Sequence, residues 1–391
     1  MSTKRWPVLV IGCVLLLFLG VIYAWSLFVA PLEAEFGYTR AQTSSVFAIS
    51  ISLFCIGAIV AGFIARKINF QNVLRLSALF LLLGFGLAAL WGTLDGFKVG
   101  YGVLCGFGVG LGYNAVLASS IKWFPDKPGF CNGILLMGFG AGSMVLGAAI
   151  TMLMGAFGWR LTFFVFGGVF ALIMLVGSFL LKPPSQQLVA AKQPAVAAEE
   201  VPPLKMLAKP SFYLAYIAML VLAAGGLAII GQAAPMALGL GAVTALSTLL
   251  VGLISVCNGL GRIFFGGLFD RIGKKRAMLY VSVTMFAALG VLTLSLLFSQ
   301  IALLVVGFLL VGLAFGGVPS TGSAFINRTY GGKNYAVNLS LFNSNLIPAA
   351  LLGPMLAGSI FTATGSYLPI LFVLLGCAAL AGILIALIRD R

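Results

Sequence analysis

Histidine is absent from the sequence and charged side chains are scarce: only 8% of the 391 residues are Asp, Glu, Lys or Arg. Without imidazole, a Ser-His-Asp triad, a histidine-containing metal site and a histidine proton relay are excluded. A soluble domain carries about a quarter charged residues, so a soluble globular protein is excluded as well. No pair of buried carboxylates and no nucleophile with its base stands out. The sequence therefore predicts neither an enzyme nor a metal or cofactor site.

Cysteine is too scattered to form a framework. The six cysteines are separated by long stretches of sequence and lie mostly within apolar runs. This spacing matches neither a set of metal ligands nor a set of disulfides. We therefore interpret the cysteines as small buried hydrophobic residues.

Apolar residues, by contrast, are abundant and make up 61% of the chain. Runs of about 20 apolar residues, each long enough to cross a hydrocarbon core about 30 Å thick, recur along its whole length. Fifty glycines suit membrane helices whose backbones pack closely. The sequence predicts an all-α integral protein of the cell (inner) membrane. Its twelve expected spans are 7–30, 42–65, 73–94, 97–120, 131–155, 161–181, 211–233, 245–269, 277–298, 301–325, 335–360 and 366–388.

A polar stretch separates the sixth and seventh spans. Residues 182–210 include KPPSQQLVAAKQPAVAAEEVPP, in which Pro, Ala, Gln and charged residues replace Leu, Phe and Gly. Such a composition is typical of a solvated linker. We therefore expect a six-helix bundle at 1–181, a cytoplasmic linker at 182–210 and a second six-helix bundle at 211–391.

The positive charge is distributed unevenly among the loops. A net charge of +15 would indicate nucleic acid only if the basic residues clustered on a folded face. Here nearly all of the 23 Lys and Arg residues fall on one side of the membrane; Arg40, Lys98 and Arg160 fall on the other, and Arg262 lies inside a span. This asymmetry places both termini in the cytoplasm, facing the anionic lipid of the inner leaflet, and it argues against a nucleic-acid partner.

A loop motif occurs in both halves. GGLFDRIGKK, residues 266–275, follows the eighth span, and a degraded copy, AGFIARKIN at 61–69, follows the second. Two six-helix halves joined by a cytoplasmic linker, each with this loop, resemble the major facilitator superfamily of secondary transporters. The resemblance implies two bundles that rock around a central cavity.

The second copy of this loop is a candidate gate. Asp270, Arg271, Gly273 and Lys274 lie at a cytoplasmic helix end, where a charge network between Asp270 and its basic neighbours would favour one gate state. Alternatively, the loop is a charged turn that only anchors the helices. The first copy carries Ala65 where the second has Asp270, so such a latch is expected to be asymmetric.

Arg262 is the main candidate for substrate binding. It lies inside the apolar run VGLISVCNGLGRIFFGGLF, where an arginine costs roughly 2.5–3.5 kcal/mol, so it should face a cavity and meet an anion. Asn258 and Ser255 share its helix face by their spacing. A guanidinium grips a carboxylate with two hydrogen bonds. The alternative is a structural ion pair, with Asp270 as the nearest acid, or a side chain that reaches the inner surface.

Aromatic residues within the first half are weaker candidates. Tyr23 and Trp25 lie near the outer part of the first span and belong either to the site or to an interfacial aromatic belt. Tyr113 and Asn114 follow a glycine-rich helix face that favours packing, and the tyrosine hydroxyl then needs a cavity or a partner.

Amide side chains mark two spans of the second half. Gln232, beside expected helix breaks at Gly231 and Pro235, either lines the cavity or caps the outer end of its helix. In the eleventh span, three asparagines either contact the ligand or form interhelical hydrogen bonds; they are Asn338, Asn343 and Asn345.

A narrower resemblance covers most of the chain. The segments that carry it are YAWSLFVAP at 23–31, EFGYTRAQ at 35–42, GVGLGY at 108–113, KWFPDK at 122–127 and NGLGR at 258–262. They look like the corresponding segments of the oxalate:formate antiporter and monocarboxylate transporter group. The resemblance implies that a small carboxylate binds against Arg262 and Tyr113.

The sequence departs from this group at one position. The resemblance implies a second cation, a lysine in the eleventh span, where the best ungapped match places Leu346; no Lys or Arg lies between Lys333 and Arg389. One buried cation balances one carboxylate better than two. We therefore predict a monomeric transporter of a monoanion such as formate, lactate or pyruvate, working by anion exchange or proton-linked symport. The alternatives are oxalate or dicarboxylate exchange, multidrug export, and a non-transporting membrane receptor on the same fold.

Overall fold

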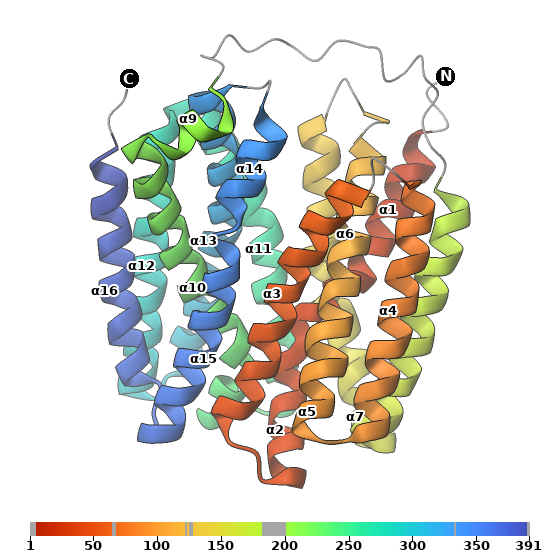
Figure 1. The fold of residues 1–391 in the computed structure, drawn as a ribbon. Helices are drawn as coiled ribbons and strands as arrows, with labels where there is room; N and C mark the ends of the chain where they lie inside the picture. The colour runs from red at the N-terminus through yellow and green to blue at the C-terminus, as the bar shows by residue number, and fades with distance from the viewer. Residues whose placement is uncertain are drawn as a thin grey trace. The chain divides into compact units, whose positions relative to one another are not determined.

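The computed structural model describes residues 5–64, 68–121, 123–124, 128–181, 201–331 and 334–388. This part of the chain consists of helices and short connections and contains no strand. The helices form two compact units, Met1–Gln193 (unit 1) and Pro194–Arg391 (unit 2), which Figure 1 shows in red to yellow-green and in green to blue.

In unit 1, the first span is longer than the hydropathy indicates. It continues through a 3-10 segment into α2, so Glu33 and Glu35 lie in a helix and not, as expected, in an outer loop. The helices of unit 1 are α1 (Arg5–Leu19), η2 (Gly20–Trp25), α2 (Ser26–Phe36), α3 (Arg40–Ile64), α4 (Phe70–Trp91), α5 (Leu94–Phe97), η3 (Lys98–Cys105), α6 (Gly106–Ile121) and α7 (Pro128–Leu180).

The long helix α7 is interrupted near its middle. It has 53 residues, which as a straight helix would measure about 80 Å and exceed the thickness of a membrane. Gly158 has non-helical backbone angles, φ 76° and ψ 170°. This φ lies in the region that favours glycine. Two helical segments therefore meet at Gly158, between the expected fifth and sixth spans.

Unit 2 contains the remaining helices. Its third and fourth helices, for example, are joined at Gly273 with no more than that residue between them. The helices are α9 (Pro203–Leu207), α10 (Pro210–Gly239), α11 (Thr244–Ile272), α12 (Lys274–Phe298), α13 (Ile301–Tyr330), α14 (Tyr335–Asn343), α15 (Leu346–Thr364) and α16 (Leu368–Ala386).

The described residues include eleven helical stretches that are long and apolar enough to cross a membrane. Ile134–Leu180, which contains Gly158, counts once among them. Large apolar side chains on these stretches remain exposed, among them Leu90 at 69% and Met152 at 74%. Such apolar surface suits contact with lipid, where helices satisfy their own backbone groups. The protein is a multi-pass, all-helical membrane protein.

Backbone contact holds α11 and α13 together. A Cβ atom added to Gly316 would lie 2.0 Å from the Asn258 carbonyl oxygen, and one added to Gly261 would lie 2.1 Å from that of Leu313. Such an approach requires glycine. The packing fixes the face of α11 that carries Asn258 and Arg262.

The same arrangement joins α3 and α6 in unit 1. A Cβ atom on Gly110 would lie 2.2 Å from the Phe54 carbonyl oxygen, and one on Gly57 would lie 2.4 Å from that of Phe107. Matching these contacts with those of unit 2 places Phe54 at the position of Asn258. The internal repeat seen in the loop motif therefore extends into helix packing.

The eleventh expected span is not one continuous helix. The hydropathy predicts a helix over 335–360, whereas α14 ends at Asn343 and α15 begins at Leu346. Pro348 has no N–H to donate to the carbonyl of Ser344. The N–H of Ile347 donates to that carbonyl instead, at 3.1 Å, which tightens the turn.

The break expected near Gln232 does not form. α10 continues past Gly231 and contains Pro235 within its last turns, ending at Gly239. Membrane helices tolerate an internal proline where neighbouring groups satisfy the freed carbonyl. Proline therefore interrupts one helix of unit 2 and not another.

Part of the expected linker packs onto unit 2. Val201 is 3% exposed and Met206, in α9, is fully buried. The Val201 N–H donates to the carbonyl of Tyr330 at 3.0 Å, and Asn338 Nδ2 donates to the carbonyl of Val201 at 3.1 Å. Residues 201–209 therefore belong to the folded unit, although their composition predicts a solvated linker.

Candidate substrate-binding site

The structure brings together the three polar residues expected on one face of α11. Asn258 and Ser255 are 2% and 3% exposed, and Arg262 is half-buried. Arg262 Nε donates to Asn258 Oδ1 at 3.4 Å. Asn258 is itself fixed by the contact of its backbone with Gly316, so this bond is one contact that restrains the guanidinium.

The position of Arg262 along α11 makes its charge energetically unfavourable in a membrane. Ten residues separate it from Ile272, the last residue of the helix, which corresponds to about 15 Å along the axis. The sequence has no other charged residue between Lys209 and Asp270. A guanidinium at this depth of a span is strongly disfavoured without an anion. Such a guanidinium has the chemistry that binds an anion, and the role of Arg262 in substrate binding stays a prediction.

Aromatic side chains gather in unit 1. Tyr23 and Tyr113 meet around Phe139, with ring centroids 5.5 Å and 4.9 Å from it, and Phe54 packs edge-on against Tyr113 at 5.2 Å. Tyr23 is 5% exposed and Tyr113 is half-buried. Edge-to-face contacts of this kind hold rings in defined positions. The two predicted tyrosines thus belong to one cluster.

Equivalent positions of the two units have different chemistry. By the glycine contacts, Phe54 and Ala58 of α3 correspond to Asn258 and Arg262 of α11. Unit 1 therefore carries an aromatic ring and a methyl group where unit 2 carries an amide and a guanidinium. Of the two equivalent positions, 58 and 262, only position 262 therefore carries a cation.

Trp25 is a core residue. It is 1% exposed, its indole N–H donates to the carbonyl of Thr43 at 2.9 Å, and its ring lies 4.7 Å from that of Tyr101. A buried indole with a satisfied N–H needs neither ligand nor headgroups. Trp25 is therefore not part of an exposed aromatic belt, and nothing in its surroundings supports the expected ligand contact.

Arg40, which the charge distribution predicts on the outer side of the membrane, is paired with an acid of unit 1. Arg40 Nε and Nη2 contact the two carboxylate oxygens of Glu33, each at 2.7 Å, and Thr43 Oγ1 donates to the same carboxylate at 2.8 Å. This two-point pairing satisfies both charges. Arg40 therefore stabilises the turn between α2 and α3.

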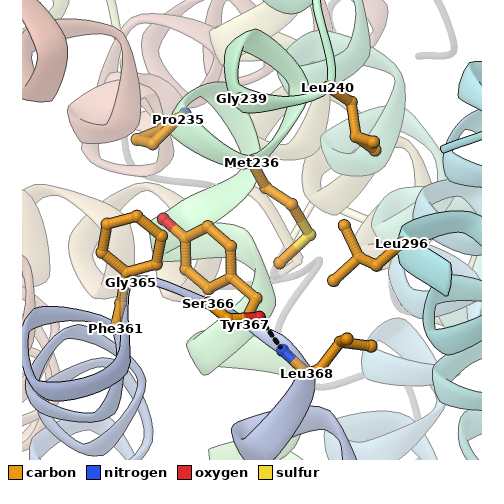
Figure 2. A pocket seen from close by; sticks show the side chains of 10 residues that line it. All are labelled: Pro235, Met236, Gly239, Leu240, Leu296, Phe361, Gly365, Ser366, Tyr367 and Leu368. Carbon is orange, nitrogen blue, oxygen red and sulfur yellow. Dashed lines mark hydrogen bonds between the residues drawn. The ribbon is translucent and has the colours of Figure 1, made fainter.

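Gln232 lies behind a small pocket at one end of unit 2. Figure 2 shows this pocket, which has a volume of about 240 Å³ and walls that include Met236, Leu296 and Tyr367. The Tyr367 hydroxyl donates to Gln232 Oε1 at 3.0 Å, and Gln232 is 1% exposed. Gln232 does not cap the end of α10, which continues to Gly239. Its side chain instead links α10 to the start of α16.

The asparagines of the eleventh span occupy two places. Asn343 ends α14 and Asn345, which is 3% exposed, directly precedes α15. Between them, Ser344 Oγ shares a hydrogen bond of 3.0 Å with the hydroxyl of Tyr216 from α10. Asn338 lies apart from them, bonded to Val201. The structure therefore brings Asn343 and Asn345 together at the helix break and assigns Asn338 to packing.

The loop residues lie at the connection between α11 and α12. Asp270 and Arg271 are exposed near the end of α11, and Lys274 begins α12. Gly273 joins the two helices with φ 83° and ψ 170°, a conformation that requires glycine. The latch between Asp270 and its basic neighbours stays a prediction.

Sequence reasoning missed residues that become relevant only through contacts between helices. Phe54 and Phe139 pack on Tyr113, and Tyr216 reaches Ser344 from a distant helix. The sequence does not show which residues of other helices an aromatic side chain in a span will contact. Pro348, in contrast, does signal the break beside Asn345, because it removes a backbone donor.

Comparison with known families accounts for this architecture. Residues 10–344 and 234–391 match the profile of the Major Facilitator Superfamily, and the two matches together span nearly the whole chain. The chain belongs to the Major Facilitator Superfamily. The prediction made from the two halves and their shared loop is confirmed.

Individual relatives indicate which transporters of the superfamily this chain is similar to. The oxalate:formate antiporter of Oxalobacter formigenes is 26% identical over 368 residues, 93% of this chain and 86% of that protein. Monocarboxylate transporter 12 of Rattus norvegicus is 26% identical over 158 residues, 40% of this chain and 32% of that protein. The crystal structure of a D-xylose–proton symporter has a TM-score of 0.76 at 14% identity, covering 98% of each chain, and shows the shared fold. This superfamily member is therefore similar to the oxalate:formate antiporter and monocarboxylate transporter group.

Proposed function

We propose that the protein is a secondary transporter that carries a small monocarboxylate, such as formate, lactate or pyruvate, by alternating access, with Arg262 as the counter-ion. The observation that carries this proposal is the half-buried guanidinium of Arg262, oriented by Asn258 in a span that has no other charge before Asp270. The similarity to the oxalate:formate antiporter and to a monocarboxylate transporter supports the same substrate class.

Further contacts to the substrate are proposed for Tyr113 and Tyr23, whose cluster combines hydroxyl groups with apolar ring surface. Asn343, Asn345 and Gln232 are weaker candidates. Amide groups suit a carboxylate because they donate hydrogen bonds without adding charge; Asn343 and Asn345 flank a helix break, whereas Gln232 lies within a continuous helix.

Substitution of Arg262 is the decisive test of this proposal. In proteoliposomes, Arg262→Gln should abolish counterflow of labelled lactate, and Arg262→Lys should lose at least about thirtyfold in apparent affinity, because the ammonium cannot form the two-point contact. The matched control is Arg75→Gln, which changes an exposed arginine of unit 1. Thermal unfolding of each variant in detergent separates loss of function from loss of fold. Near-normal flux in Arg262→Gln would remove this residue from the mechanism.

Substrate charge distinguishes the proposal from its main rival, oxalate exchange, which the Oxalobacter relative favours. Leu346, at the position expected for a second cation, is the first residue of α15, and it leaves a second carboxylate without a partner. Competition for labelled lactate uptake should therefore be stronger with formate, lactate or pyruvate than with oxalate. Saturable oxalate uptake that outcompetes every monocarboxylate contradicts this proposal.

The membrane topology that we propose has twelve spans with both termini in the cytoplasm. Gly158 supports it, because dividing α7 there turns one very long helix into two of ordinary span length. Reporter fusions at residue 158 and at the two termini test it. Fluorescence of a cytoplasm-restricted reporter at both termini, but not at residue 158, is the expected pattern.

A further inference from the structure

A short amphipathic segment precedes the first span of unit 2. α9, Pro203–Leu207, is followed by α10 after only Ala208 and Lys209. The start of a membrane span lies at the level of the lipid headgroups. α9 must therefore lie within a few residues of the membrane surface. It packs beside α14 at that end of unit 2 (Figure 1).

The inner side of this segment is fixed to the protein. Met206 is fully buried, and Val201 is bonded on one side to the carbonyl of Tyr330 and on the other to the amide of Asn338. Lys209 Nζ lies 5.9 Å from the centre of the Tyr330 ring. These contacts connect the segment to the end of α13 and the start of α14.

The outer side of the segment is apolar and basic. Leu204 is 82% exposed, the highest value among the large hydrophobic residues that the structure describes, and the neighbouring Lys205 is exposed as well. A leucine held outward beside a lysine, at headgroup level, matches the pattern of an interfacial helix: the apolar group enters the acyl boundary and the cation stays among the headgroups.

The charge of unit 2 is concentrated at this same end. Arg271, Arg276 and Arg328 are exposed there, at the ends of α11 to α13, with Asp270 as the acid among them. The connections at the opposite end, residues 239–244, 298–301 and 364–368, carry no charged residue in the sequence. Glu199 and Glu200 precede the segment in the sequence. Among the described residues at this end the basic side chains outnumber the one acid, Asp270, so this part of the surface around α9 is complementary to negative charge and the opposite end is not.

We propose that α9 is a docking element for anionic phospholipid, with Leu204 inserted into the leaflet and Lys205 paired with headgroup phosphate. Lipid binding on the outer side of the segment restrains the end of α13 and the start of α14, to which its inner side is bonded. The inference relies on the proposed orientation only to name the leaflet, which is the cytoplasmic one.

Hydrogen exchange of the full-length protein in nanodiscs tests this proposal. Discs of phosphatidylcholine alone are compared with discs containing about one-third phosphatidylglycerol, a content that gives a strongly negative surface. The amides of residues 204–209 and those at the end of α13 should exchange more slowly in the anionic discs. Residues 239–244, at the uncharged end, are the internal control and should show no difference.

Variants separate the two contacts. Lys205→Gln should reduce the anionic-lipid protection about fivefold, as expected for one basic residue at a charged surface, and Lys205→Arg should preserve it. Leu204→Glu should abolish the protection, whereas Leu204→Met should keep it. Equal exchange in both kinds of disc, or insensitivity to Leu204→Glu, overturns the proposal.

A final arm distinguishes lipid from a soluble anion. Inorganic phosphate added to phosphatidylcholine discs should not reproduce the protection; if it does, the segment binds free phosphate and the lipid proposal is wrong. The nanodiscs present anionic lipid on both faces and contain no carboxylate substrate. Failure of the transport proposal, or of the assigned orientation, therefore leaves this result unchanged.

Discussion

At the scale of single residues, the proposed substrate binding depends on how the guanidinium of Arg262 is held. Arg262 Nε donates to Asn258 Oδ1, and Asn258 is buried against α13. A guanidinium with a fixed orientation loses less conformational freedom when it binds a carboxylate. Asn258, at 2% exposure, is therefore better placed to position Arg262 than to contact a substrate itself.

Two substitutions of Asn258 test this role. Asn258→Leu removes the acceptor at similar volume and should raise the apparent KM for lactate about fivefold, with a smaller change in maximal rate. Asn258→Asp places a carboxylate beside Arg262, where it competes with the substrate as a counter-ion, and should raise the KM further. Concentration-dependent uptake in proteoliposomes measures both. An unchanged KM in Asn258→Asp means that Arg262 does not hold the carboxylate.

Residues differ in how far the sequence predicts their roles. Arg262 could be found from the sequence because a lone charge in an apolar run has few physical explanations. Trp25 could not, because its role depends on the Thr43 carbonyl, which a different helix supplies. Gln232 can be recognised in the sequence as a polar residue within a span, but its bond to Tyr367 cannot, because it joins positions 135 residues apart.

At the scale of helices, glycine contacts determine where the polar face of α11 points. Gly316→Ala adds a Cβ atom 2.0 Å from the Asn258 carbonyl oxygen, an overpacking that costs about 1–3 kcal/mol. We expect a lower melting temperature and weaker lactate transport. Gly290→Ala is the matched control, since a Cβ atom there meets nothing within 4 Å, and it should lower neither the melting temperature nor lactate transport. Equal melting temperatures for the two variants would show that the close contact of α11 with α13 does not contribute to stability.

The break between α14 and α15 offers a second test at this scale. Pro348→Ala restores a backbone donor to the Ser344 carbonyl, so the two helices should join. Hydrogen exchange of residues 344–348 should slow, and transport should weaken because Asn343 and Asn345 move relative to each other. Slower exchange with normal transport would separate the break from the substrate site.

Most helices follow from hydropathy, because about 20 apolar residues dictate a span. The exceptions arise where a backbone donor is missing or a polar segment finds partners. Pro348 and Pro235 look alike in sequence, yet only the first interrupts its helix. Residues 201–209 resemble a linker by composition, but the Tyr330 carbonyl and the Asn338 amide hold them in place.

At the scale of the molecule, charge is distributed asymmetrically over a repeated architecture. The two units share the glycine contacts of α3 with α6 and of α11 with α13, but one unit has Ala58 where the other has Arg262. Duplication therefore explains the fold, and divergence at a few positions explains the proposed site. In the proposed mechanism, the negative charge of the substrate is therefore balanced by a cation of unit 2 alone.

This asymmetry predicts that the loaded carrier moves faster than the empty one. An Arg262 without its anion retains a penalty of roughly 2.5–3.5 kcal/mol in a span, and about 1.4 kcal/mol corresponds to a factor of ten in an equilibrium. If that penalty adds to the barrier for reorientation, exchange should exceed net efflux by about a hundredfold. Release of labelled lactate from preloaded proteoliposomes, with and without external lactate, measures the ratio. An imposed pH gradient is the companion condition: if it raises net efflux to the rate of exchange, a proton crosses with the substrate and the empty carrier returns without hindrance, so the charge of Arg262 does not control reorientation.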